Sequence, residues 1–183
     1  MLEDRILVWE LKRGRAWAFD RIYAKYLDTL LTVAMGLLGD AQLAEDVVQD
    51  VLTQFVESIG GFHLKGSLKG FLATCVANRA RNLRRQRYRQ GQATIEMEDT
   101  VPQGKEPENP VDVLIRDEGL HRLHQALLEL PPEQREILVL KTHGDVSFRD
   151  LARELDISLG TVQSRYRYGL ERLRVLLEKE GLA

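Results

Sequence analysis

The stretch SFRDLARELDISLGTVQSRYRYGLERLR, from Ser147 to Arg174, decides the predicted fold. Ser147 followed by Asp150 resembles a capping box, and apolar residues then recur at the spacing of a helix that faces a core. Asp156 and Ser158 interrupt this pattern, because Asp tolerates the left-handed backbone of a tight turn and Ser can cap a helix that begins near Gly160. The stretch therefore predicts two helices joined by a tight turn.

The second helix of this pair has an apolar and a polar face. We expect its inward positions to be Val162, Tyr166, Leu170 and Leu173. Near its N-terminal end the outward side chains are Thr161, Gln163, Ser164, Arg167 and Tyr168. An exposed polar helix start is the part of a helix-turn-helix that enters the DNA major groove, and arginines such as Arg165 suit phosphates. A helical hairpin with a merely polar outer face is the alternative, and the spacing leaves many DNA-binding families open.

Composition limits the class of protein. The chain has 183 residues, enough for one large or two small domains that fold without covalent cross-links. A single cysteine, Cys75, excludes an intrachain disulfide framework, and its apolar neighbours favour an inert core residue. The first residues are charged, and no segment approaches the roughly 20 apolar residues of a membrane span. We therefore expect a cytoplasmic protein without membrane insertion.

The net charge of −2 conceals an uneven distribution of charge along the chain. One short segment is purely basic, with Arg79, Arg81, Arg84, Arg85, Arg87 and Arg89. The next is acidic, with Glu96, Glu98, Asp99, Glu106, Glu108 and Asp112. Two adjacent segments of opposite charge indicate two different partners, or one partner with two surfaces.

An acidic face is predicted on the helix expected over residues 41–58. Its apolar residues define an inner face, and Glu45, Asp46, Gln49 and Asp50 gather on the other side. Paired carboxylates could bind a metal or perform acid–base catalysis, but no His or Cys stands nearby at ligand spacing. We therefore expect no metal, no cofactor and no catalytic site. A docking surface for a partner protein and a merely solvated face both remain open.

A loop over residues 59–66 precedes a helix expected over residues 67–89, and together they carry a candidate nucleic-acid site. The loop places the rings of Phe62 and His63 at its centre. The following helix presents on one face Asn78, Arg81, Asn82 and Arg85. Guanidinium groups beside rings and amides can hold the backbone and the unstacked bases of single-stranded nucleic acid. Inward packing of Phe62 and a solvated arginine-rich helix end are the alternatives.

The apolar pattern disappears between Gln90 and Pro110 and resumes near residue 113. Prolines and a glycine exclude a continuous helix there, so this acidic segment is predicted to be a flexible linker. The predicted fold class is all-α: a helical bundle over 1–90, an acidic linker over 91–112 and a helix-turn-helix domain over 113–183. We expect two separate compact units, with the arginine-rich helix face accessible.

Several stretches resemble a known family in order and in spacing. AFDRIYAKY, LLGDAQLAEDVVQDV and FLATCVANRARNLRR resemble successive helices of region 2 of bacterial RNA polymerase sigma factors, of the small two-domain, extracytoplasmic-function (ECF) type. LLELPPEQREILVLKTHGDVSFRDLARELDISLGTVQSRYRYGLERLR resembles region 4 of the same family. The resemblance covers nearly everything except the linker.

The resemblance implies a function and a role for each group of residues. The chain would bind the core RNA polymerase and direct initiation at promoters, with a probable anti-sigma factor as a further partner. Asp46, Gln49 and Asp50 would dock on the polymerase. The single-stranded non-template strand of the minus-10 element would be captured by Phe62, His63, Asn78, Arg81, Asn82 and Arg85. The duplex minus-35 element would meet Thr161, Gln163, Ser164, Arg165, Arg167 and Tyr168. A stand-alone helix-turn-helix regulator that binds duplex DNA as a dimer is the alternative.

Some positions depart from the family's habit. Phe71, expected on the buried side of its helix, stands where Trp is usual, and Gln163 replaces a frequent Lys or Arg. Gln prefers adenine whereas Arg prefers guanine, so the minus-35 preference is expected to differ from that of relatives with Arg. Gly169 inside a helix should cost about 1 kcal/mol relative to Ala.

Overall fold

The computed structural model describes residues 2–89 and 118–179, and their regular elements are α-helices and one 3-10 turn. The elements are α1 (Leu2–Lys12), α2 (Ala16–Leu38), α3 (Ala41–Glu57), η1 (Ile59–Gly61), α4 (Leu68–Arg89), α6 (Glu118–Leu128), α7 (Pro132–Thr142), α8 (Phe148–Glu154) and α9 (Leu159–Lys179). The all-α prediction is confirmed, while the predicted linker lies outside the described residues. None of the described helices combines the length and hydropathy that a bilayer-spanning segment requires.

The hairpin between α2 and α3 is set by Gly39 and Asp40. Gly39 adopts a left-handed φ of 75°, and its N–H donates to Met35 O at 2.9 Å, which ends α2. The Asp40 carboxylate then accepts the Leu43 N–H at 2.9 Å and begins α3. These two residues turn the chain back on itself, so that the apolar faces of α2 and α3 meet.

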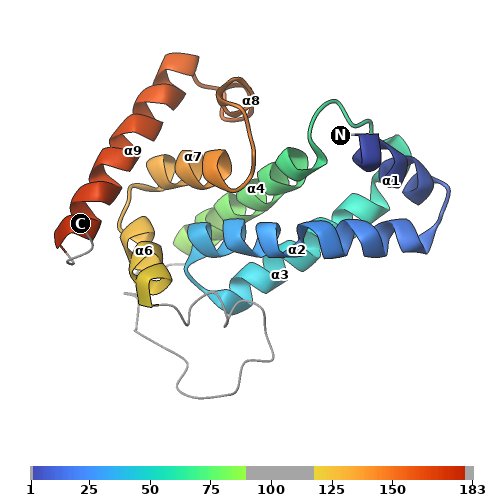
Figure 1. Ribbon diagram of the computed structural model, residues 1–183, viewed down its shortest axis with the longest axis horizontal. Helices are drawn as coiled ribbons and strands as arrows, with labels where there is room; N and C mark the ends of the chain where they lie inside the picture. The colour runs from blue at the N-terminus through green and yellow to red at the C-terminus, as the bar shows by residue number, and fades with distance from the viewer. Residues whose placement is uncertain (1, 90–117, 180–183) are drawn as a thin grey trace.

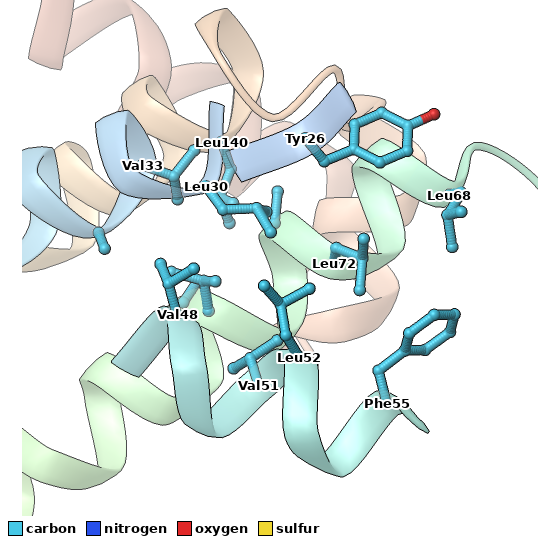
Figure 2. Packing of buried hydrophobic residues seen from close by; sticks show 14 of the residues in the cluster. Tyr26, Leu30, Val33, Val48, Val51, Leu52, Phe55, Leu68, Leu72 and Leu140 are labelled. Atoms are coloured by element: carbon cyan, nitrogen blue, oxygen red, sulfur yellow. The ribbon is translucent and has the colours of Figure 1, made fainter. Parts of the chain in front are cut away.

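The core of the N-terminal unit lies between α2, α3 and α4 (Figure 2). The buried side chains drawn there include Leu30 and Val33 of α2, Val48, Val51, Leu52 and Phe55 of α3, and Leu68 and Leu72 of α4. They recur at the three- and four-residue spacing of helix faces that meet a core. Leu140 of α7 reaches the same cluster beside Val33.

Helix α1 is attached to α2 by a buried carboxylate. Asp4 accepts a hydrogen bond from the Tyr26 hydroxyl at 2.6 Å and from Lys25 Nζ at 2.8 Å. Burial alone would raise the pKa of Asp4, but the hydrogen bonds from Lys25 and Tyr26 outweigh it and hold the pKa below its usual value. Burial and the Asp4 carboxylate raise the pKa of Tyr26 to about 12. The charged carboxylate therefore stabilises the folded state.

The predicted helix-turn-helix is present, and the predicted capping residues begin both of its helices. Ser147 Oγ accepts the Asp150 N–H at 3.1 Å, which begins α8. Asp156 has a φ of 52°, so the tight turn does place an Asp in the left-handed region. Ser158 Oγ accepts the Thr161 N–H at 3.0 Å and caps α9, which begins at Leu159.

One predicted inward position on α9 is wrong. Leu170 is 42% exposed, whereas the adjacent Gly169 is buried. A Cβ at Gly169 would lie 2.8 Å from Leu138 Cδ1 and 3.3 Å from Gln134 Cβ, both on α7. The helix face that meets α7 is thus rotated by one residue, and the close approach requires a residue without a side chain.

The two units pack together, contrary to the expectation of separate bodies. Helix α7 lies against α2 and α4 (Figure 1), and Ile137, Val139 and Leu140 are buried in one continuous core with the N-terminal unit. The approach is close: a Cβ at Gly36 of α2 would lie 3.0 Å from Val139 Cγ2. A Cβ at Gly144, just after α7, would lie 2.9 Å from the Cβ of Ala73 on α4. The domain boundaries of 1–90 and 113–183 stay a prediction.

Replacement of Asp4 by Ala should lower the free energy of unfolding by about 2–3 kcal/mol at pH 7, because Tyr26 and Lys25 lose a charged acceptor. The folded pKa is lowered, so this contribution is present above the ordinary carboxyl pKa and is lost as the pH falls through the lower folded value. Urea unfolding at neutral and acidic pH measures it. Asp20→Ala, at an exposed position on α2, is the control.

Gly169→Ala should destabilise the protein by about 1 kcal/mol, because overpacking against Leu138 outweighs the gain in helix propensity. Gly160→Ala, on the same helix, should be neutral or stabilising, since the nearest atom to its Cβ would be Ser158 Oγ at 3.8 Å. Urea unfolding of both variants separates propensity from packing. A stabilised Gly169→Ala protein would contradict the close contact between α7 and α9.

Candidate nucleic-acid and polymerase interface

The candidate single-strand site on α4 is divided by the C-terminal unit. Asn82 and Arg85 are exposed, as expected. Asn78 instead donates from Nδ2 to Glu154 Oε1 of α8 at 2.7 Å. The expectation of one accessible face is therefore wrong for Asn78 and Arg81, which bond to the C-terminal unit.

Arg81, on the same face of α4, pairs with a buried carboxylate. Its guanidinium forms an ion pair with Glu136 of α7, through Nη2 and through Nε at 3.4 Å. Glu136 is only 8% exposed. A buried carboxylate needs a hydrogen-bonded cation, so each residue fixes the position of the other.

The aromatic rings near the 59–66 loop form a packed cluster. Phe62 contacts Phe55 of α3 edge-on, with ring centroids 5.3 Å apart, and lies 4.6 Å from the ring of Phe71 on α4. The alternative of inward packing is thus the one observed for Phe62. Phe71 was expected on the buried side of α4 but is 38% exposed. His63 is exposed, and its Nδ1 donates to Gly61 O at 2.9 Å. The accessible rings here are therefore His63 and Phe71.

The acidic face of α3 is partly occupied by α4. Asp46 and Gln49 are exposed, as a docking surface requires. Asp50 Oδ2 accepts hydrogen bonds from Arg79 Nε at 3.0 Å and from Arg79 Nη2 at 2.6 Å. Sequence reasoning missed the role of Arg79, because it is one of many arginines in its segment and nothing in the spacing singles it out. Arg79 holds the Asp50 carboxylate in a fixed position beside Asp46.

Three of the predicted DNA-contact residues at the start of α9 are exposed. They are Gln163, Arg167 and Tyr168, with the Arg167 guanidinium 5.0 Å from the centre of the Tyr168 ring. Thr161 and Ser164 are half-buried and bonded within the helix start, since Ser164 Oγ donates to Thr161 O at 3.0 Å. Arg165 is also half-buried. Gln163, Arg167 and Tyr168 are therefore the best-placed base-reading candidates.

Cys75 lies on α4, one turn before Asn78, and has the features of an inert thiol. Burial, with a smaller effect from the negative charge of Glu154, raises the pKa of Cys75 to about 11. A thiol with this pKa is protonated at neutral pH and is a poor nucleophile. Within residues 2–89 and 118–179, no cluster of three or more His, Cys, Asp or Glu side chains is arranged to hold a metal ion.

Comparisons with known proteins identify both units. Residues 22–90 match the family model for Sigma-70 region 2, and residues 120–173 match the model for Sigma-70, region 4. The RNA polymerase sigma-H factor of Pseudomonas aeruginosa is 29% identical over 89% of this chain and 88% of its own length. The ECF RNA polymerase sigma factor RpoE of Cereibacter sphaeroides is 32% identical over 86% of this chain and 84% of its own length.

Two solved structures are also similar to this chain. The sigma factor RpoE in complex with the anti-sigma factor NepR, from Bartonella quintana, has a TM-score of 0.68 and 28% identity, and the match covers 87% of this chain and 96% of that one. CnrH, solved in complex with the cytosolic domain of CnrY, has a TM-score of 0.70 at 22% identity, covering 98% and 99% of the two chains. The second match shows a shared fold.

Cys75 should react slowly with a neutral disulfide reagent in the folded protein at pH 8. A pKa of about 11 in place of 9.0 lowers the thiolate fraction about a hundredfold. Ellman's reagent, read before and after urea unfolding, measures the reaction. An equal rate in the folded and the unfolded protein would contradict the burial of this thiol.

Proposed function

The chain belongs to the sigma-70 family of RNA polymerase sigma factors, of the ECF type, and on this premise we propose that it binds the core RNA polymerase and directs initiation at specific promoters. The observation that carries the proposal is the presence of both region 2 and region 4, in that order, on one chain. A stand-alone helix-turn-helix regulator would not need a region 2. The protein acts as a binding factor rather than an enzyme, without a cofactor, in the cytoplasm where the polymerase works.

The α3 surface is the proposed contact with the polymerase. Asp46 and Gln49 are exposed, and Asp50 is held beside them by Arg79. A fixed arrangement of carboxylates loses less side-chain entropy on binding than a mobile one. Exposure and a fixed geometry together support this surface as the docking site.

The minus-10 and minus-35 elements are assigned to α4 and α9 respectively. On α4, Arg81 and Arg85 would hold the backbone of the separated non-template strand, and Asn78 and Asn82 would read bases. His63 and Phe71 supply accessible rings at the adjacent loop. On α9 the exposed polar positions fit the major groove of duplex DNA. Each contact can be weak, because docking on polymerase raises the effective concentration of both reading helices along one promoter.

A further proposed partner is an anti-sigma factor. The Bartonella quintana relative, 28% identical to this chain, is in complex with such a protein. The match covers nearly all of that sigma factor, so the surfaces available for such a partner would correspond. Co-purification with the tagged protein, followed by mass spectrometry, would identify such a partner.

Reconstituted transcription tests the proposed function. The purified chain is mixed with core polymerase and a library of genomic fragments, and the transcripts are sequenced. Transcripts that start at shared sites only when both components are present are the expected result. A chain that neither binds core polymerase nor changes the start sites would overturn the proposal.

Gln163→Ala should change the minus-35 preference without loss of polymerase binding. A bidentate Gln–adenine contact contributes about 1–3 kcal/mol of discrimination, and Gln163→Arg should shift the preference toward guanine. Selection of minus-35 sequences from a randomised duplex library with the holoenzyme measures both effects. Glu171→Gln, exposed further along α9, is the control. An unchanged preference in both Gln163 variants would remove this residue from the reading surface.

A further inference from the structure

A cavity beside the ion pair between Arg81 and Glu136 has a strongly basic lining. The cavity measures about 160 Å³ and lies where α4 and α7 meet the end of α2. Its charged lining residues are Arg81, Arg84 and Arg87 of α4, and Arg135 and Glu136 of α7. Glu136 compensates one of the four guanidinium charges, so three positive charges remain around one small space.

The arginines on the α4 side of the cavity follow one another at three-residue spacing, which places their side chains along one side of the helix. Within residues 2–89 and 118–179, Arg81 alone of these three forms an ion pair. Arg84 is exposed and Arg87 is half-buried. Both guanidinium groups can therefore be reached from the solvent and have donors free for a ligand.

Arg135, on the α7 side of the cavity, is positioned by backbone carbonyls. Its Nη2 donates to Leu128 O at 2.5 Å and to Leu130 O at 3.1 Å, and its Nη1 donates to Leu37 O at 3.3 Å. Its Nε is buried without a hydrogen-bond partner in the part of the chain that the structure describes. Burial, with a further effect from the charge of Arg84, lowers the pKa of Arg135 to about 10. The carbonyls thus fix this guanidinium without neutralising it, and its charge repels that of Arg84.

We propose that this cavity is a binding site for a small phosphorylated anion, whose phosphate groups bind Arg84 and Arg87 in the positive field of Arg135. Guanidinium groups form bidentate, charge-assisted hydrogen bonds with phosphate oxygens, which makes arginine the side chain best suited to this ligand. A bound anion replaces the repulsion between Arg84 and Arg135 with two attractions. The site goes beyond the proposed function, which gives no role to Arg84 or Arg87.

The size and the walls of the cavity limit the ligand. At about 30 Å³ for each water in the liquid, its volume is that of about five water molecules, which admits one or two phosphate groups but not a nucleic-acid strand. The rest of the lining is apolar: Leu37, Leu38, Leu43, Ala77, Ala80, Leu83 and Pro132. Apolar walls lower the local dielectric and strengthen the attraction between the arginines and an anion. The ligand is therefore a free phosphate or diphosphate, or the phosphate end of a larger molecule.

Isothermal titration calorimetry of the full chain with sodium pyrophosphate tests the site. Sodium chloride holds the ionic strength constant, and divalent cations are left out because they bind pyrophosphate themselves. Wild type should bind one pyrophosphate per chain, about tenfold more tightly than inorganic phosphate, since a diphosphate can contact Arg84 and Arg87 at once. Arg84→Gln and Arg87→Gln should each weaken the binding of pyrophosphate about tenfold, a change of about 1.4 kcal/mol.

Arg89→Gln is the matched control, because it removes the same charge from an exposed position of α4 outside the cavity lining. Its affinity for pyrophosphate should stay within about twofold of wild type, a change of about 0.4 kcal/mol. Circular dichroism checks the folding of each variant. Saturating pyrophosphate should also raise the midpoint of thermal unfolding of wild type and of Arg89→Gln, since a ligand of the folded state stabilises it, but not that of the double variant Arg84→Gln/Arg87→Gln.

ADP distinguishes the two sources of a diphosphate group. An affinity for ADP equal to that for pyrophosphate assigns the cavity to the phosphate end of a nucleotide, and an affinity at least about tenfold weaker assigns it to a free inorganic anion. Either result retains the site.

The proposal is overturned if wild type shows no saturable binding of pyrophosphate. It is overturned equally if the folded Arg84→Gln and Arg87→Gln variants keep the affinity of Arg89→Gln, because binding then reflects only the general positive charge of α4. These titrations contain neither polymerase nor promoter DNA, so their outcome is independent of the proposed function.

Discussion

The burial of α7 against α2 and α4 is the contact on which the arrangement of the molecule depends. It joins two units that each have their own helices into one continuous apolar core. Burial of a side chain such as Val139 contributes about 1.5–3 kcal/mol relative to exposure.

The buried ion pair gives this apolar contact its specificity. Ion pairs that leave water recover little net energy, since desolvation offsets most of the Coulomb attraction. The pair between Arg81 and Glu136 is therefore better explained by what it excludes than by what it adds to stability. Loss of Arg81 would leave the Glu136 carboxylate, which is only 8% exposed, without this cation, and a buried unpaired charge is far more costly than a lost apolar contact. The register of α7 on α4 is fixed for this reason, and α8 follows because it is joined to α7 by a short connection.

The elements and caps of this fold follow from local sequence. Ser147 and Asp156 each predict a helix boundary because the physical reason for each lies within four residues of the chain. The apolar spacing likewise places most of the core. Gly169 shows the limit of this reasoning: helix propensity treats it as a cost, whereas its purpose is to admit Leu138 from another helix. The inward packing of Phe62 and the tie between Arg79 and Asp50 also depend on neighbours that are distant in sequence.

The packing of the two units could not be predicted from the sequence, because it too depends on contacts between residues that are distant along the chain. It changes how the arginine-rich segment is interpreted. An arginine-rich helix face is readily interpreted from the sequence as an open nucleic-acid surface. Here two carboxylates from residues 136 and 154 reach that face through the fold. Asn82 and Arg85 of the same face stay exposed, so the sequence pattern located the face but could not show that half of it is bonded within the chain.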